Sequence, residues 1–199
     1  MARGRKVNSN GERSKQLLLE KAIELFSIHG YHETKISDIV KAANLTQPTF
    51  YLYFQSKDKV FNDLNKEFSD NLVFIFTEKL QEVKESNAHT IRFIQESIES
   101  AFNYFYDNPN LTKIGFYEAP TANQLKDQIA QLFASILKND RGSLGLNTEV
   151  EIEILAHSIV GAMERLTIKY ILTKQQTPSK LANDLITIYF ANQLEMATR

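Results

Sequence analysis

Apolar side chains recur at helical spacing in a short segment of the N-terminal part of the chain. Ile36, Ile39, Val40 and Ala43 would share one face of a helix. Thr34 lies just ahead of this segment and is the expected N-cap. The pattern therefore predicts a short helix with a single buried face.

A tight turn and a second short helix are predicted to follow. Asn44 stands where a left-handed residue ends a helix, and Thr46 stands where an N-cap begins the next one. Pro48 fits the first turn, in which a missing N–H costs nothing. Phe50 and Phe54 share one side of the second helix. Two such helices predict a helix-turn-helix, whose second helix would enter a DNA major groove.

The other side of the second helix carries residues that suit DNA. Gln47 can pair with adenine, and Thr49 can bond a base or touch a thymine methyl group. The hydroxyls of Tyr51 and Tyr53 can reach phosphates. An ordinary helical hairpin with a solvated polar face has the same pattern, so both interpretations stay open at this point.

A wider set of elements occurs in order and at fixed spacing over residues 12–65. The elements are Ala22 to Tyr31, Thr34, Ser37 to Ile39, and Thr49 to Lys57. Together they resemble the DNA-binding domain of the tetracycline-repressor (TetR) family. The resemblance implies a dimeric, ligand-responsive transcriptional regulator, a repressor, that binds a pseudo-palindromic operator and is released by a small-molecule inducer. Lys35, Asn44 and Pro48 depart from the usual pattern of the family, so the operator sequence does not carry over.

The expected DNA-binding residues follow from this pattern and this resemblance. They are Thr34, Lys35, Ser37, Thr46, Gln47, Pro48, Thr49, Tyr51, Tyr53 and Lys57. Lys57 opens a new helix after Ser56, at a place suited to a phosphate, and the resemblance implies a backbone contact there. Residues 1–9 are predicted to be a disordered basic arm, which either lies on DNA or is solvated.

The rest of the chain shows helical periodicity and no strand-like alternation, so the predicted fold is all-α with about nine helices. Besides the two short helices above, longer helices are expected at 10–29, 57–84, 91–107, 125–136, 148–174 and 178–197, a short helix at 111–117, and a loop at 139–145. The predicted domains are a helix-turn-helix domain at 1–56 and an effector-binding and dimerisation domain at 57–199.

The last two helices are apolar on two sides, which favours burial on two sides. In the resembling family the corresponding helices form a dimer interface. The expected interface residues are Ile154, Ser158, Gly161, Ile168, Leu172, Ile186, Tyr189 and Phe190. A helix pair buried within one chain is the alternative. A C₂ dimer would match two DNA half-sites.

Aromatic residues gather in the three preceding helices, as they do around apolar ligands. The resemblance places an inducer among them. The expected lining residues are Phe102, Tyr106, Phe116, Tyr117, Phe133 and His157. Most of these aromatics would be plain core under the alternative interpretation.

Charge and composition narrow the function. Residues 1–60 carry ten Lys and Arg against six Asp and Glu, whereas the remainder carries thirteen against eighteen. A basic front suits a partner rich in phosphate. No cysteine, paired-histidine motif, glycine-rich phosphate loop or nucleophile elbow is present, so no metal, cofactor or enzymatic activity is expected. The sequence shows no membrane span, and a cytoplasmic location is expected. A helical enzyme or small-molecule carrier without a DNA-binding role is the rival interpretation.

Overall fold

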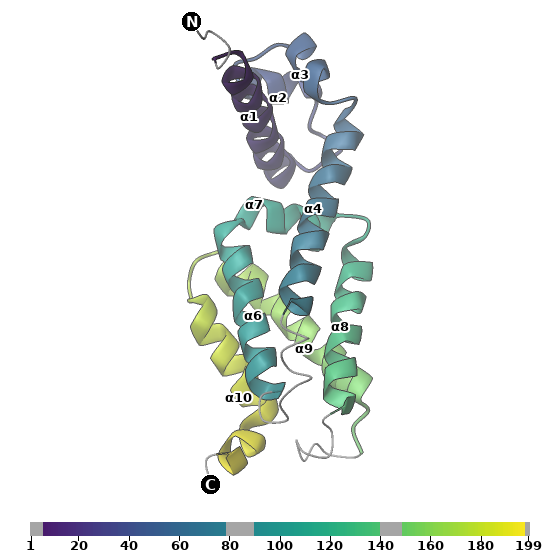
Figure 1. Cartoon of the computed structure of the whole chain (residues 1–199), viewed down its shortest axis with the longest axis vertical. Coiled ribbons are helices and arrows are strands. Elements are labelled where there is room, and N and C mark those ends of the chain that lie inside the picture. Colours follow the sequence, from purple (N-terminus) through teal and green to yellow (C-terminus); the bar gives the residue numbers. More distant parts are fainter. Residues whose placement is uncertain (1–5, 79–89, 140–148, 198–199) are drawn as a thin grey trace, which may run out of the picture. The chain divides into compact units, whose positions relative to one another are not determined.

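The computed structural model describes residues 6–78, 90–139 and 149–197, and every regular element in these ranges is a helix (Figure 1). The predicted all-α fold is confirmed. The first five residues of the predicted arm fall outside the described residues, and so does the predicted loop at 139–145 except for Asn139. Asn139 is the last residue of a helix and not part of a loop. No helix of the described ranges is long and apolar enough to span a bilayer.

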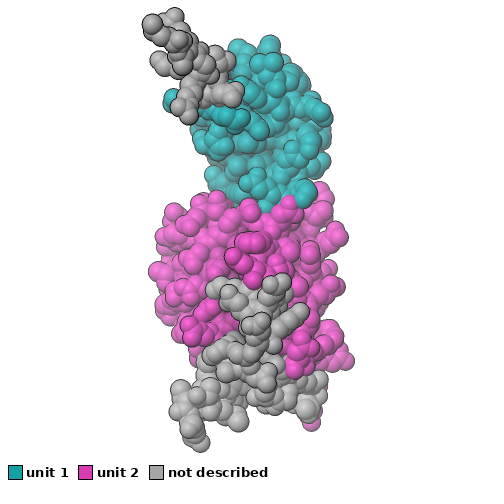
Figure 2. Space-filling model, in the orientation of Figure 1, with its two compact units in different colours: residues 1–68, 110–119 teal, residues 69–109, 120–199 magenta. Residues whose placement is uncertain are grey.

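The chain divides into two compact units (Figure 2). The first comprises residues 1–68 and 110–119, and the second comprises residues 69–109 and 120–199. These compact units differ from the two domains that the sequence predicts, which meet between residues 56 and 57. The predicted boundary separates two functions, and it stays a prediction.

The first unit contains helices α1 (Lys6–His29), α2 (Ile36–Ala42) and α3 (Gln47–Tyr53), and the first part of α4 (Lys57–Thr77). Its core combines one apolar face from each helix. The fully or almost fully buried members of this core are Leu18, Ala22, Phe26, Ile39, Val40, Ala43, Phe50, Phe54, Val60, Phe61, Leu64 and Ile114. Ile114 comes from residues 110–119, so a distant segment of the chain completes this core.

Local signals in the sequence set the ends of these helices. Gly30 has a φ of 79° and Asn44 a φ of 52°, so both adopt the left-handed conformation that ends a helix. The hydroxyl of Thr46 accepts the N–H of Thr49 at 3.4 Å, and the hydroxyl of Ser56 accepts the N–H of Lys59 at 3.0 Å. The sequence predicted that these four residues begin or end helices, and the structure confirms all four.

The second unit is built from α6 (Thr90–Asp107), α8 (Ala122–Asn139), α9 (Ile152–Leu166) and α10 (Pro178–Ala197). Helix α6 packs on α10, and α8 packs on α9 (Figure 1). The π-helical turn η2 (Thr167–Ile171) continues α9. Helix α7 (Pro109–Thr112) leads into a second π-helical turn, η1 (Lys113–Glu118), which belongs to the first unit.

Several predicted helix limits need correction. Helix α1 begins at Lys6 and not at residue 10, because residues 6–10 contain neither proline nor glycine to stop it, so residues 6–9 are helical. The predicted helix at 148–174 is a shorter α9 followed by η2, and Lys174 with a φ of 55° lies past its end. The predicted end of α4 near residue 84 falls outside the described residues.

Candidate nucleic-acid interface

Helix α3 presents one side to the core and the other to solvent. Phe50 is fully buried and Phe54 almost so, and the two rings contact each other with centroids 5.3 Å apart. Pro48 lies in the first turn, as predicted, where its missing N–H disturbs no helical hydrogen bond. Gln47, Pro48, Tyr51 and Leu52 are exposed. The short helix is thus fixed from within by aromatic packing, and its polar side remains available to a partner.

The turn between α2 and α3 holds this orientation. The N–H of Leu45 donates to the carbonyl of Val40 at 2.8 Å, and the N–H of Asn44 donates to the carbonyl of Lys41 at 3.1 Å. These bonds satisfy carbonyls that the end of α2 would otherwise leave open. Leu45 then packs against the core of the first unit, as predicted.

Thr34 is the one predicted DNA-binding residue whose side chain is buried. Its hydroxyl lies 2.8 Å from the carbonyl oxygen of Gly30 and 3.2 Å from that of Leu25. The N-cap of α2 is Lys35, whose N–H donates to the carboxylate of Asp38 at 3.0 Å. The predicted cap at Thr34 is therefore wrong, because its hydroxyl closes the end of α1.

Lys57 ties the start of α4 to the loop after α1. Its ammonium donates to the carbonyl oxygens of Tyr31 and Thr34, both at 2.8 Å, and lies 4.2 Å from the centroid of the Tyr31 ring. An ammonium has three N–H donors. Two of them are used inside the unit, which leaves one for an external acceptor such as a phosphate.

The Tyr31 ring is also part of this contact between the start of α4 and the loop after α1, which we call the α1–α4 junction. It lies against Phe26 and Phe61, with centroids 5.8 Å and 4.4 Å away, and its hydroxyl donates to the carboxylate of Asp58. This hydrogen bond, with burial and the negative charge of Asp58, raises the pKa of Tyr31 to about 12. The bond requires the protonated hydroxyl, so it is lost when Tyr31 ionises in alkali.

A pH titration tests this junction. The pKa of Tyr31 is higher in the folded than in the unfolded chain, so its contribution to stability is complete below about pH 10 and is lost as the pH rises towards about 12. We expect wild type to exceed Tyr31→Phe in free energy of unfolding at pH 8, and this difference to shrink between pH 10 and 12. Urea denaturation at each pH measures it, with Tyr51→Phe as the control. A constant difference would contradict the assigned bond.

The structure places most of the predicted DNA-binding residues on the surface of the first unit. The exposed ones are Lys35, Ser37, Thr46, Gln47, Pro48 and Tyr51, and the partly buried ones are Thr49, Tyr53 and Lys57. The hydroxyls of Thr46 and Thr49 lie 2.9 Å apart and share a hydrogen bond, so both take part in capping α3. Gln47 and Tyr51 stand one helical turn apart, so they lie on the same side of α3.

The predicted ligand-lining residues are divided between the two units. Phe116 and Tyr117 belong to the first, where the ring of Phe116 lies 6.3 Å from that of Phe68. Phe102 and Phe133 are buried in the second, where Phe133 packs edge-on against Phe76. The ring of Tyr106 is partly covered by the ammonium of Lys174, 4.8 Å from its centroid.

His157 does not lie in the interior as predicted. Its side chain is 54% exposed, and its Nδ1 atom is 3.9 Å from a carboxylate oxygen of Asp127. Position 157 falls on the side of α9 opposite the buried residues Ile159 and Met163, so the helix turns it to solvent. Among the described residues, no group of three metal-ligating side chains comes together here or elsewhere.

The predicted dimer residues separate into two groups. Ile154, Ser158, Gly161 and Ile168 are exposed along α9 and η2, Leu172 and Tyr189 are partly buried, and Ser158 and Tyr189 share a hydrogen bond of 2.7 Å. Ile186 and Phe190 are buried within the second unit itself, so these two are not on its surface. Both sides of α10 are apolar in sequence, and the pattern alone did not tell which side α6 covers.

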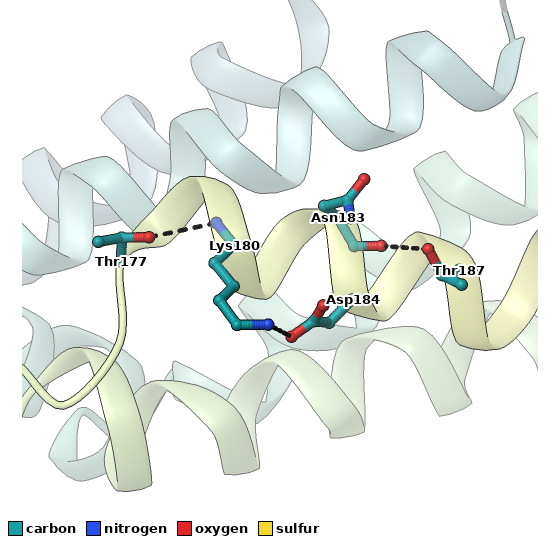
Figure 3. A network of polar contacts seen from close by, with 5 residues as sticks. All are labelled: Thr177, Lys180, Asn183, Asp184 and Thr187. Carbon is teal, nitrogen blue, oxygen red and sulfur yellow. Dashed lines mark hydrogen bonds and ion pairs between the residues drawn. The ribbon is translucent and has the colours of Figure 1, made fainter.

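Several polar residues at the start of α10 and along one side of it pair with one another (Figure 3). The N–H of Lys180 donates to the hydroxyl of Thr177 at 3.4 Å, and its ammonium pairs with Asp184 at 2.7 Å. The hydroxyl of Thr187 donates to the carbonyl of Asn183 at 2.8 Å. Ile188, beside this strip, is 74% exposed. The polar strip is an ordinary solvated face, whereas Ile188 is an unpartnered apolar side chain.

Sequence reasoning missed four residues that the structure brings forward. Leu52 and Ile188 are exposed although apolar, and Ser97 and Thr167 are buried although polar. Within the described part of the chain, the hydroxyls of Ser97 and Thr167 have no hydrogen-bond partner. The helical pattern could have identified Leu52 as exposed, since a residue two positions from the inward-facing Phe50 lies on the outer side of α3. The other three depend on tertiary packing.

Comparisons with known proteins agree with this geometry. Residues 18–64 match a family described as "Bacterial regulatory proteins, tetR family". The HTH-type transcriptional regulator YdgC of Bacillus subtilis (strain 168) is 32% identical over 188 residues, which cover 94% of this chain and 96% of that protein.

Two solved structures show the same fold. A TetR-like transcriptional regulator from Rhodococcus sp. RHA1 superposes with a TM-score of 0.70 at 20% identity, covering 91% of this chain and 96% of that one. The regulator FadR of Bacillus subtilis in complex with stearoyl-CoA superposes with a TM-score of 0.66 at 18% identity, covering 89% and 98%. At these identities the likeness concerns the fold alone.

Proposed function

Because the chain belongs to the TetR family of bacterial transcriptional regulators, we propose that it acts as a dimeric repressor that leaves its operator when a small molecule binds. The observation that carries the proposal is α3, which is anchored by buried Phe50 and exposes Gln47 and Tyr51. Such a helix can enter a major groove and read base edges. The basic balance of the first sixty residues fits a partner rich in phosphate.

The contacts to DNA divide into base reading and backbone positioning. Gln47 is proposed to pair with an adenine, and Tyr51 to reach the phosphate beside it. Lys35 and Ser37, exposed at the start of α2, are proposed to contact the backbone. Lys57 is proposed to offer its third N–H to a phosphate while the other two hold the loop after α1.

Dimerisation is proposed through the exposed apolar side chains of α9, η2 and α10. Ile154 is 62% exposed and Ile188 is 74% exposed, and both lie in the second unit. A Cβ atom on Gly161 would meet nothing within 4 Å, so a partner can approach the backbone of α9 closely there. A two-fold dimer would carry two copies of α3, and half-sites one helical turn apart, about 34–36 Å, require such a pair.

The effector is proposed to bind in the second unit, among aromatic residues that include Phe102 and Phe133. Buried hydroxyls without partners cost about 1–3 kcal/mol each, and Ser97 and Thr167 are such groups within the described residues. They are suited to orient the polar end of a mostly apolar ligand. To release the operator, the effector must bind a conformation that does not fit DNA more tightly than the DNA-binding conformation. Equal affinity for both conformations would shift no population.

Selection of bound duplexes from a random DNA pool tests the proposed function. We expect one enriched sequence with two inverted half-sites, and loss of binding to it when the effector is added. Acyl-CoA thioesters are the first compounds to try, because the FadR structure holds stearoyl-CoA. Failure to enrich any duplex would contradict the proposal and favour the rival helical carrier or enzyme.

Salt dependence separates the proposed roles of Lys57 and Gln47. Lys57→Met should weaken binding to the selected and to random duplexes alike and lower the slope of log affinity against log salt by about one unit. Gln47→Ala should leave the slope unchanged and weaken the selected duplex by about 1–3 kcal/mol. Fluorescence anisotropy at four salt concentrations measures both. A lower affinity of Lys57→Met with an unchanged slope would assign its ammonium to the loop alone.

A further inference from the structure

The outermost residue of α3 is apolar. Successive residues of a helix are about 100° apart, so Leu52 lies on the side opposite Phe50 and Phe54, which are buried. Leu52 is 78% exposed and is the most exposed large apolar side chain of the described residues. Pro48, also exposed, is one helical turn before it. We call these two residues the Pro48–Leu52 ridge.

Polar and amphipathic side chains border this ridge on both sides. Gln47 and Tyr51 lie one turn apart on one side, and Thr49 and Tyr53 lie one turn apart on the other. The ridge contributes nothing to the core of the first unit, from which Leu52 and Pro48 are absent. An apolar strip only two side chains wide is far too small for a stable protein interface, which buries about 800 Å² on each partner.

A DNA major groove offers one apolar group of matching size. Thymine alone carries a methyl group on the groove edge, whereas the other bases present only hydrogen-bond donors and acceptors there. A helix that enters the groove with its buried side towards the protein must turn its opposite side, and hence the ridge, to the groove floor. Uncompensated burial of Leu52 against polar base edges would be unfavourable, since those edges would lose water without gaining a partner.

We propose that the Pro48–Leu52 ridge contacts the 5-methyl groups of thymines, so that each operator half-site carries a thymine that is recognised by its methyl group. This inference rests on the proposed function and names one base that the operator must contain. It makes Leu52 a residue that sets sequence specificity through apolar contact, beside Gln47, which reads by hydrogen bonding.

Replacement of thymine by uracil removes this methyl group and changes no Watson–Crick pairing. In the duplex enriched from the random pool, each thymine is replaced in turn by deoxyuridine, in one half-site and then in both. Burial of one methyl group corresponds to about a fourfold change in affinity, so we expect one position per half-site at which wild type loses about fourfold, and about fifteenfold for both half-sites.

The Leu52→Ala variant should bind the thymine duplex more weakly and lose most of the difference between thymine and uracil at that position, because only Pro48 of the ridge remains. Ile28→Ala is the matched control, since Ile28 is an exposed apolar residue of α1 in the same unit, and it should keep the full thymine-to-uracil ratio. Leu52→Met should keep most of the ratio, because it remains apolar. Circular dichroism confirms that each variant is folded.

The outcomes distinguish this inference from the proposed function. If no duplex is enriched, both fail. If a duplex is enriched but no thymine can be distinguished from uracil, or if Leu52→Ala keeps the wild-type ratio, the ridge does not read methyl groups although the protein binds DNA. A ratio lost in Leu52→Ala and kept in Ile28→Ala supports the assignment.

Discussion

Gly115→Ala is expected to destabilise the first unit by about 1–3 kcal/mol, the usual cost of overpacking a core, or by more. A Cβ atom at Gly115 would overlap the ring of Phe68 and would lie 2.9 Å from its Cβ atom. Phe68 is fully buried, and its ring lies tilted against that of Phe116 with centroids 6.3 Å apart, so a close-packed interior leaves it little space to move into. The free energy of unfolding, from urea denaturation, measures the loss.

A second substitution tests the cause of this loss. Phe68→Ala removes the Cγ and Cδ1 atoms that the added Cβ atom would overlap, so the double variant should be more stable than the sum of the two single effects predicts. Gly11→Ala is the control, because Gly11 also lies in a helix of the first unit and its Cβ atom would make only an ordinary contact at 3.4 Å with Tyr53. It should gain up to about 1 kcal/mol. Wild-type stability of Gly115→Ala would contradict the close approach.

The expected loss matters for function because residues 110–119 complete the core that supports α3. Ile114, beside Gly115, belongs to the same buried cluster as Phe50. Loosening this cluster would remove the support of the residues that face DNA, so Gly115→Ala should weaken operator binding although position 115 is far from α3 in the sequence.

The features that sequence predicted well are those that neighbouring residues determine. Thr46 caps α3, Asn44 ends α2 in the left-handed conformation, and Phe50 faces inward, each because of chemistry within a few residues. The resemblance to the TetR family is confirmed, and with it the prediction of a transcriptional regulator that is not an enzyme.

The features that sequence missed depend on distant contacts. The sequence predicted Thr34 as an N-cap, but its hydroxyl donates hydrogen bonds to the carbonyl oxygens of Leu25 and Gly30 instead. Helical periodicity gives no sign of the two π-helical turns. Where both sides of a helix are apolar, as at Ile186, periodicity cannot tell which side the chain itself buries.

The double variant Ile154→Asp, Ile188→Asp is expected to be a monomer if the proposed interface is correct. Each substitution would place a carboxylate in a contact that excludes water, where an unpaired charge is strongly unfavourable. Both side chains are exposed in the single chain, so the fold and stability of the second unit should remain nearly unchanged. Sedimentation equilibrium measures the mass, and thermal denaturation monitors the fold.

Loss of the dimer should have the largest effect on DNA binding. Two linked α3 helices bind the second half-site at high effective concentration, and separating them should cost about 10²- to 10⁴-fold in affinity for the full operator. Affinity for an isolated half-site should stay at the wild-type value, because α3 is untouched. A simple defect in folding would lower both.

Phe74→Asp is the matched control for the dimer variant. Phe74 is an exposed aromatic residue of α4 in the second unit and lies outside the proposed interface. It should keep the dimer and the full-operator affinity although it also adds a carboxylate to the surface of the second unit. A wild-type protein that sediments as a monomer at micromolar concentration would contradict the proposed dimer. A double variant that remains a dimer would place the interface elsewhere, since the exposed isoleucines of α9 and α10 would then not join the two copies.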